Sequence, residues 1–439
     1  MYCYSKEKSL NSLPIELLIG IIKQMDLNSL LEFRKTNKIA NEIFEQSDEY
    51  LLLKYNLTNR GNLLYLYIDY NSTTKEKITT YYKKIYNKKE IIVYNKKIKE
   101  LPLLPNIEIL DCENSQLTRL PDGMISLIEL DCKNNQLTEL PSGLTSLKKL
   151  DCRNNQLTEL PSGLSSLEVL KCGNNQITSL PSGLTSLKTL FCGNNQITEL
   201  PSGLTSLESL YCESNQITSL PSGLTSLKTL FCKNNHLTKL PDATNSLKHL
   251  YCSNNQITSL PSGLTSLISL NCYSNQLTRL PNGMNSLKEL KCNSNQITKL
   301  PNDMNSLKEL FCGNNQLTKL PSGLTSLEKL FCSNNQLTKL PEDTTSLEQL
   351  FCSNNQLTKL PENTTSIQEL CCDNNLLTSL PDEITSLQIL HCQNNLLTKL
   401  PDGMISLIEL YCHNNQLTKL PNGMNSLGIL SWYNNPGNL

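Results

Sequence analysis

Residues 140–159 spell Leu-Pro-Ser-Gly-Leu-Thr-Ser-Leu-Lys-Lys-Leu-Asp-Cys-Arg-Asn-Asn-Gln-Leu-Thr-Glu, and close variants of this phrase return every twenty residues without an insertion. The cysteine marks the period, from Cys112 in steps of twenty to Cys412, and Trp432 takes the same slot once more. Sixteen cysteine turns and one tryptophan turn make seventeen turns in all. A fixed period of this length is typical of a solenoid, in which each turn packs only against its neighbours.

The spacing of apolar residues within one turn predicts a short strand and an extended return segment. Leu170 and Cys172 lie two residues apart, so both side chains point to one face of a strand. Asn175 follows the cysteine by three residues, and asparagine recurs there in every turn but the first, which has Ser115. A buried amide is tolerated only when it is hydrogen-bonded, so we expect it to bond adjacent turns. Pro181 favours an extended or polyproline-like chain on the outer side.

The position of Gly163 varies among later turns, where Asp303, Asp343 and Asn363 replace the glycine. Aspartate and asparagine tolerate a positive φ better than most residues. We therefore expect a positive φ at this position, although Glu383 fits that expectation badly.

The run Leu-x-x-Leu-x-Cys-x-x-Asn-x-Ile over residues 167–177 resembles the leucine-rich repeat, with cysteine in one leucine slot. The resemblance implies an α/β solenoid, a horseshoe with short parallel strands on its concave face and mostly extended convex segments. It extends over residues 101–439 in about seventeen 20-residue turns.

Composition narrows the class of protein further. The formal net charge of −1 favours no particular class of partner. No apolar run approaches a membrane span of about eighteen residues, and the N-terminus lacks a signal peptide, so we expect a soluble, cytoplasmic protein. Sixteen of the eighteen cysteines share one inward position, which predicts reduced, buried thiols. Without any Cys-x-x-Cys we expect no metal site and no cofactor.

A helical pattern precedes the repeats. Asn11 or Ser12 can cap a helix, Pro14 is tolerated in its first turn, and apolar residues follow at helical spacing. Residues 10–50 resemble the F-box, a small helical domain, although the family's usual tryptophan is missing from residues 39–42. The resemblance implies binding to the Skp-type adaptor of a cullin–RING ubiquitin ligase. The adaptor-binding residues that it implies are Leu13, Pro14, Leu17, Leu18, Ile21, Leu30 and Leu31.

Residues 51–100 form a tyrosine- and lysine-rich linker. We expect helical segments near 48–56 and 75–87 and a strand at 91–94, together capping the first repeat. No groove-reading motif accompanies the lysines, so nucleic acid is not the expected partner.

The residue before each cysteine points outward, because side chains alternate along a strand. Exposed aromatic residues at this position are typical of binding hot spots, yet the same rings could simply stack along the sheet. Both interpretations stay open. The predicted target-binding residues are Phe191, Tyr211, Phe231, Tyr251, Phe311, Phe331, Phe351 and Tyr411.

Two other features are weaker candidates. Cys371 and His391 would lie about 5 Å apart on adjacent strands, close enough for a nucleophile pair or a metal site. No third residue is placed to orient the histidine, so we predict no catalytic residue. The residue after each threonine changes from acidic to basic along the chain, and this basic stripe could steer an acidic partner. We expect neighbours such as Glu342 and Asp382 to neutralise much of it.

The leading hypothesis is a non-catalytic substrate receptor, whose F-box docks on the ligase adaptor while the repeats capture a protein for ubiquitin transfer. The alternative is a leucine-rich-repeat scaffold whose N-terminal helices act only as a cap. The repeats also resemble those of bacterial-effector-like ubiquitin ligases, which carry a catalytic domain after them; with four residues following Asn435, we do not expect that class. The near-identical turns also resemble repeat families of giant DNA viruses, which would place the protein in a host cytoplasm.

Overall fold

The computed structural model describes strands Leu63–Leu66 and Glu90–Val93, residues 101 and 104, and residues 106–242, 244–362 and 365–437. The chain divides into two compact units, Met1–Gln176 (unit 1) and Ile177–Leu439 (unit 2). The predicted helices of residues 10–50, 48–56 and 75–87 lie outside the described residues. In the described parts, no helix is long and apolar enough to cross a membrane.

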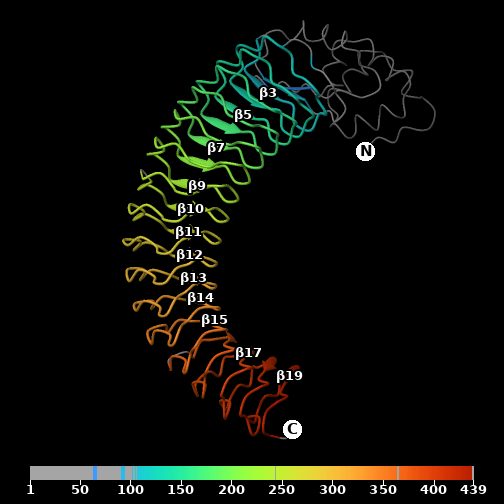
Figure 1. Ribbon diagram of the computed structural model, residues 1–439. Coiled ribbons are helices and arrows are strands. Elements are labelled where there is room, and N and C mark those ends of the chain that lie inside the picture. The colour runs from blue at the N-terminus through green and yellow to red at the C-terminus, as the bar shows by residue number, and fades with distance from the viewer. Residues whose placement is uncertain are drawn as a thin grey trace, which may run out of the picture. The chain divides into compact units, whose positions relative to one another are not determined.

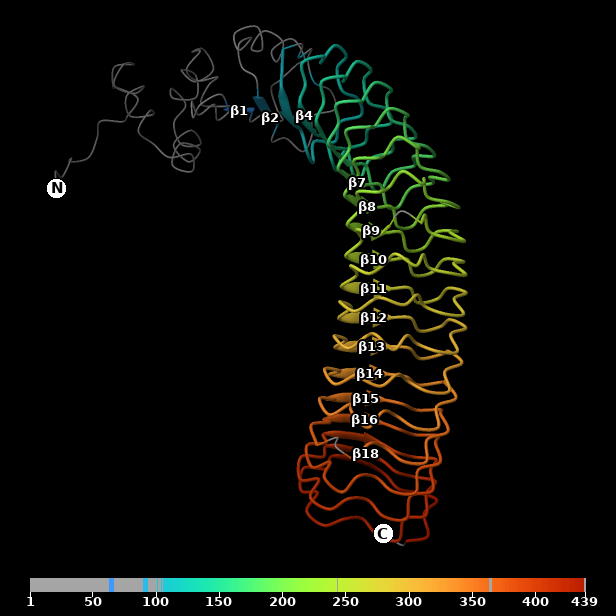
Figure 2. The same cartoon turned by 90° about the vertical axis from the view of Figure 1, so that its left-hand side faces the viewer.

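Each turn of the repeat contributes one three-residue strand. Figure 1 shows the strands of unit 2 following one another along the stack, and Figure 2 shows them along one edge of it. The strands of unit 1 are β1 (Leu63–Leu66), β2 (Glu90–Val93), β3 (Ile109–Asp111), β4 (Glu129–Asp131), β5 (Lys149–Asp151) and β6 (Val169–Lys171). Those of unit 2 are β7 (Thr189–Phe191), β8 (Ser209–Tyr211), β9 (Thr229–Phe231), β10 (His249–Tyr251), β11 (Ser269–Asn271), β12 (Glu289–Lys291), β13 (Glu309–Phe311), β14 (Lys329–Phe331), β15 (Gln349–Phe351), β16 (Glu369–Cys371), β17 (Ile389–His391), β18 (Glu409–Tyr411) and β19 (Ile429–Ser431).

Neighbouring repeat strands pair in parallel with a register of one period. Leu250 lies opposite Leu230 on one side and Leu270 on the other. In unit 1, β2 pairs with β3 and so places the predicted strand near 91–94 against the first repeat. Strand β1, which pairs with β2, was not predicted. The predicted leucine-rich-repeat solenoid is confirmed.

The core of a turn consists of the residues that the apolar pattern marks. Leu187, Leu190, Cys192 and Ile197 are completely buried. In nearly every repeat strand the middle residue is buried and its two neighbours are half-exposed. We call the solvent side of the strands the strand face; it carries the residue before each cysteine.

The recurrent asparagine bonds adjacent turns as expected. The Oδ1 atom of Asn255 accepts a hydrogen bond from the Leu237 amide at 2.9 Å. Its Nδ2 atom donates to the carbonyl oxygens of Cys232 and Cys252, each at 3.0 Å. Asn155 in unit 1 makes the same three bonds. A half-buried amide with all these partners stabilises the stack instead of weakening it.

Among the described residues, the expected positive φ at the Gly163 position is found at eight glycines, among them Gly163 at 85°, but not at Gly203 or Gly223. Asp303 and Asp343 are not in the left-handed region, so that part of the prediction is wrong. Their carboxylates instead accept hydrogen bonds from the backbone amides of Gly283 and Gly323, one turn earlier. These aspartates therefore hydrogen-bond adjacent turns and do not adopt a left-handed backbone conformation.

Candidate binding surface on the strand face

The strand face of unit 2 carries two columns of stacked aromatic rings. In the first column, Phe191 stacks on Tyr211 with ring centroids 4.2 Å apart, and Phe231 stacks on Tyr251 at 4.3 Å. Tyr211 and Phe231 join these pairs at 4.9 Å. The one-period register places the rings at neighbouring heights, so the sequence column becomes a continuous stack.

The second column comprises Phe311, Phe331 and Phe351, stacked at 4.5 Å per step. Its first ring is also covered by the ammonium of Lys291, whose Nζ atom lies 5.1 Å from the ring centroid of Phe311. That ammonium pairs with Glu289 at 2.6 Å. The second column therefore begins next to the ion pair of Lys291 and Glu289.

Seven of the eight predicted target-binding residues thus lie in these two columns. Tyr411 is the exception, since it meets His391 edge-on at 4.7 Å and 68°. All eight of these residues are half-exposed, so each leaves part of its surface open to solvent. Stacking is observed, and binding by these rings stays a prediction.

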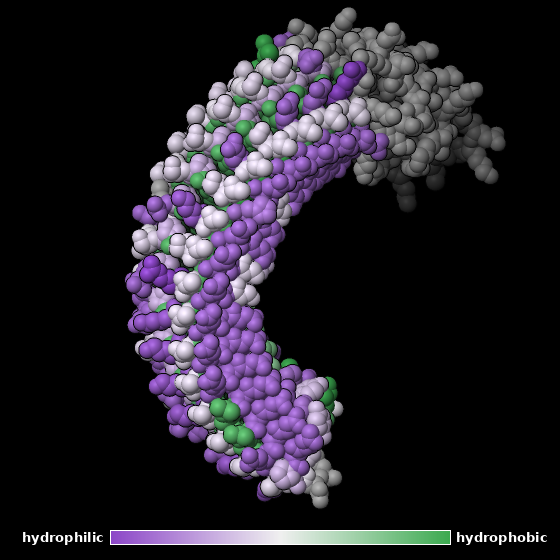
Figure 3. Space-filling view, in the orientation of Figure 1, coloured by the Kyte–Doolittle hydropathy of each residue, from purple (hydrophilic) through white to green (hydrophobic). Residues whose placement is uncertain are grey.

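The side of unit 2 seen in Figure 3 is mostly hydrophilic, with hydrophobic surface gathered near its C-terminal end. Leu376 and Leu396 are 48% and 42% exposed, at a position that most other turns fill with glutamine. These two exposed leucines of adjacent turns form a smaller apolar feature than either aromatic column.

The strand face of unit 1 is charged instead of aromatic. Arg153 donates to Asp151 from Nε at 2.9 Å and from a terminal nitrogen at 2.6 Å. Lys133 pairs with Asp131 at 2.9 Å and with Glu113. Because both carboxylates hold its ammonium, the pKa of Lys133 is raised.

Among the described residues, the carboxylates of Asp111, Glu113 and Asp131 are the one grouping close enough to hold a metal ion, with ligand oxygens within 4.8 Å. The ammonium of Lys133 already lies against two of these carboxylates. Burial raises the pKa of Asp111, and the neighbouring carboxylates raise it further. The cluster is an ion-pair network with its own cation.

Cys371 and His391 face each other across strands β16 and β17, as predicted. The structure corrects the expectation that nothing orients the histidine, because Nε2 of His391 lies 3.0 Å from Oε1 of Glu409. Burial raises the pKa of Cys371 to about 12, and Asp373 and Glu369 add to the shift. The thiol therefore stays protonated at neutral pH, which disfavours a nucleophilic role.

The seven predicted adaptor-binding residues lie outside the described residues. Sequence comparison covers them instead. A family model described as "F-box domain" matches residues 10–52. A second, described as "Leucine Rich repeats (2 copies)", matches residues 125–166, 165–206, 205–245, 245–283, 305–343 and 325–364. Comparison with curated proteins gives no match.

Solved structures of bacterial leucine-rich-repeat proteins resemble the chain. YopM from Yersinia enterocolitica is 27% identical, with a TM-score of 0.55 over 83% of this chain and 96% of YopM. The LRR protein LIC12759 from Leptospira interrogans is 28% identical, with a TM-score of 0.60 over 74% of this chain and 96% of its own. An internalin from Listeria monocytogenes is 25% identical over 61% of this chain and 81% of its own, with a TM-score of 0.50.

Both matched modules are typically non-catalytic and mediate protein interactions. The repeats supply a regular surface, and the F-box match precedes them in the same chain. The chain is therefore an F-box and leucine-rich-repeat protein.

Proposed function

We propose that the protein is the substrate-recognition subunit of a Skp–cullin–F-box type ubiquitin ligase. The observation that carries the proposal is the F-box match at residues 10–52 in the same chain as a long repeat surface. F-box domains commonly bind Skp-type adaptors, and leucine-rich repeats commonly bind proteins. The chain itself performs no chemistry in this role, and other subunits transfer ubiquitin.

The aromatic columns of unit 2 support the second half of the proposal. Their rings are half-buried and stacked at 4.2–4.9 Å, so they are ordered before a partner arrives. An ordered anchor loses little conformational freedom on binding, which raises affinity. Aromatic residues are also enriched among binding hot spots. We assign target capture to this face.

The proposal also places the protein in the cytoplasm, where the ligase subunits work. The cysteines of the described residues are all free thiols, which suits a reducing compartment. For a viral protein this means the cytoplasm of the host, with a host ligase redirected to a new target.

The test is binding of the full chain to a purified Skp-type adaptor by calorimetry. We expect micromolar or tighter affinity, and loss of at least tenfold in the Leu13→Ala, Leu17→Ala double variant. The matched control is Tyr211→Ser, Phe231→Ser, which alters the strand face and leaves adaptor binding unchanged. Absence of binding by the full chain would refute the ligase role and leave the scaffold alternative.

A further inference from the structure

Four cations form an uninterrupted stripe on the convex segments of unit 2. Arg279, Lys299, Lys319 and Lys339 occupy the same position in successive turns, and all four are exposed. Each lies between an exposed threonine and a buried leucine. Adjacent strands lie about 4.8 Å apart and the turns spread further on the convex side, so the four backbone positions span at least about 14 Å.

These four residues, the basic stripe, are followed at the same position of the next turn by Lys359, which pairs with Glu342. Elsewhere the repeat places opposite charges in adjacent turns, as in Lys228–Glu208 and Lys308–Glu328, both at 2.7 Å. Within the described part of the chain, the basic stripe makes no ion pair.

The expected neutralisation of this column by nearby carboxylates is found only in later turns. Lys359 pairs with Glu342 at 3.3 Å and Lys399 with Asp382 at 3.4 Å. Like charges held in adjacent turns repel one another, and exposure to solvent keeps the repulsion small. Four unpaired cations at one-turn spacing therefore repel one another in the free protein, and an anionic partner would relieve that repulsion.

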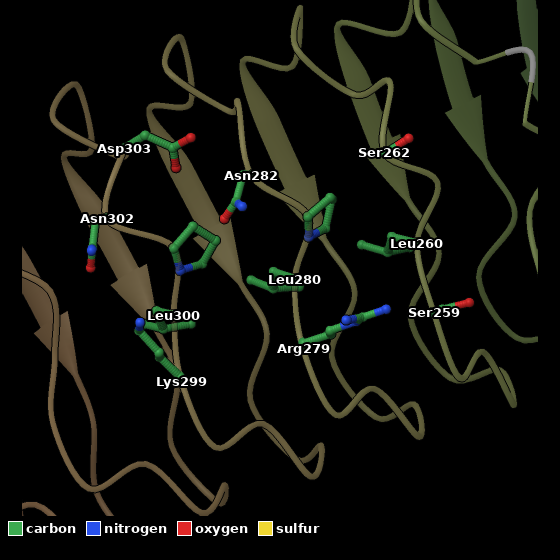
Figure 4. A pocket seen from close by; sticks show the side chains of 12 residues that line it. Ser259, Leu260, Ser262, Arg279, Leu280, Asn282, Lys299, Leu300, Asn302 and Asp303 are labelled. Atoms are coloured by element: carbon green, nitrogen blue, oxygen red, sulfur yellow. The ribbon is translucent and has the colours of Figure 1, made fainter.

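One end of the basic stripe borders a hollow of about 930 Å³ (Figure 4). Besides Arg279 and Lys299, neutral hydrogen-bonding side chains line it, among them Asn282 and Asn302. Asp303 also lines it, and Figure 4 places this residue at the opposite end from the two cations. The hollow thus offers donors beside the cations without a carboxylate next to them.

We propose that the basic stripe binds an acidic α-helix of a partner protein. Carboxylates at positions i, i+4, i+7 and i+11 lie on one face of a helix and span about 16 Å. That length is close to the stripe's span of at least about 14 Å, and flexible lysine stems accommodate the difference. An extended strand would need about 20 Å to present four side chains on one face. The helix therefore fits the spacing better.

Single-stranded nucleic acid fits the basic stripe less well. Non-specific binding of single strands uses aromatic side chains on which bases stack. The chain neighbours of each stripe residue are threonine, leucine and proline, as in Thr298, Leu300 and Pro301, and the described lining of the hollow holds no aromatic residue. The net charge of −1 also differs from the strongly basic composition of such proteins. The inference does not depend on the F-box.

The test uses the full chain and a fluorescein-labelled helical peptide of alanine and glutamate, with its glutamates on one face. We expect fluorescence anisotropy to show binding that weakens at least tenfold in Lys299→Gln, Lys319→Gln. The matched control is Lys228→Gln, Lys248→Gln, which removes the same charge from another column and leaves affinity unchanged. A peptide of identical composition with glutamates distributed around the helix should bind at least fivefold more weakly.

Three results would overturn the proposal. One is equal weakening by both double variants, because it would indicate unspecific charge attraction. Another is a deoxythymidine oligomer that binds more tightly than the peptide and is lost in the stripe variant, which would indicate a nucleic-acid track. The third is absence of binding.

A second readout separates a binding surface from an ordinary solvated face. Lys319→Glu inserts a carboxylate between Lys299 and Lys339, so it should raise the Tm of the free protein while weakening peptide binding at least tenfold. A lowered Tm would show that the stripe carries no repulsion to relieve and would contradict the premise.

Discussion

The strand faces of the two units use the same position in opposite ways. In unit 1 it carries Asp131 and Asp151, which neighbouring cations neutralise. In unit 2 it carries rings such as Phe231 and Tyr251, which stack. Behind both faces lie the same leucine, cysteine and asparagine columns, and the asparagines make equivalent hydrogen bonds in both units. The inward positions thus determine the fold, and the outward positions vary in chemistry without disturbing it.

This separation predicts that a substitution at an inward position lowers the free energy of unfolding by the same amount in either unit. A substitution at an outward position should lower it by an amount that depends on the contacts of that side chain. The predictions below test the two halves of that statement.

The largest effect should come from pH, because both units share the thiol column. Burial raises the pKa of Cys172 in unit 1, and of Cys252, Cys292 and Cys332 in unit 2, to about 12. Unfolded thiols lose their protons from about pH 9, so the stabilisation is complete below pH 9 and falls above it. Above pH 9, each buried thiol should lower the free energy of unfolding by about 1.4 kcal/mol per pH unit. Urea unfolding between pH 8 and 10.5, with reductant present, measures the loss.

The control for this prediction is Cys252→Ala, which removes one thiol from the column. Its stability should start lower, because a small cavity forms, and should fall less steeply with pH by one thiol's share. Stability that does not change up to pH 10.5 would contradict burial of the thiols.

The second-largest effect should come from the recurrent asparagine, tested by Asn155→Ala in unit 1 and Asn255→Ala in unit 2. Each variant loses two hydrogen bonds to the preceding turn and one to the cysteine carbonyl of its own turn, which leaves backbone groups without partners, so each should lose about 2–4 kcal/mol. Urea denaturation measures both. The comparison is sharp because the two losses should agree within about 0.5 kcal/mol.

The exposed neighbours Gln156 and Gln256 supply the controls, since their replacement by alanine should change stability by less than about 0.5 kcal/mol. A loss confined to one unit would break the claim that the interiors are equivalent.

The outward position should distinguish the units. Tyr211→Ala removes two ring stacks, at 4.2 and 4.9 Å, and should cost about 1–3 kcal/mol. Asp131→Ala removes a half-exposed ion pair and should cost less than about 1 kcal/mol. Thermal unfolding of both variants gives the difference. Tyr211→Phe keeps the stack and should be nearly neutral, and a loss as large as that of Tyr211→Ala would assign the effect to the hydroxyl.

The same distinction explains which features the sequence predicts. Every inward residue repeats at a fixed interval, so the period alone predicts the register that places Phe311 over Phe331. Features made by one turn leave no periodic signal. The contact between His391 and Glu409 depends on the direction of two side chains across a strand pair. The hydrogen bond from the Gly283 amide to Asp303 depends on a local backbone geometry in which glycine, but not aspartate, has a positive φ. Strand β1 was missed because Leu63–Leu66 precedes the repeats and has no period to reveal it.

A further missed feature gives the smallest effect. The residue before the buried asparagine has a positive φ in every turn, and unit 1 always has asparagine there, as in Asn154 at 56°. Unit 2 has serine at three such positions, including Ser214 and Ser294, both at 55°. Asparagine tolerates this left-handed region better than serine. Ser214→Asn should therefore stabilise unit 2 by about 0.5 kcal/mol, measured by urea denaturation, and Asn154→Ser should weaken unit 1 by a similar amount.

Ser214→Gly separates the two possible sources of that gain. Glycine removes the left-handed strain but supplies no side-chain amide, whereas asparagine also extends the exposed amide contacts such as Asn254 to Asn234 at 2.8 Å. If glycine matches asparagine, the backbone alone accounts for the preference. If Ser214→Asn stabilises and Ser214→Gly does not, the exposed amide contacts also link the turns. This outward position would then contribute to the stability of the stack as the inward asparagines do.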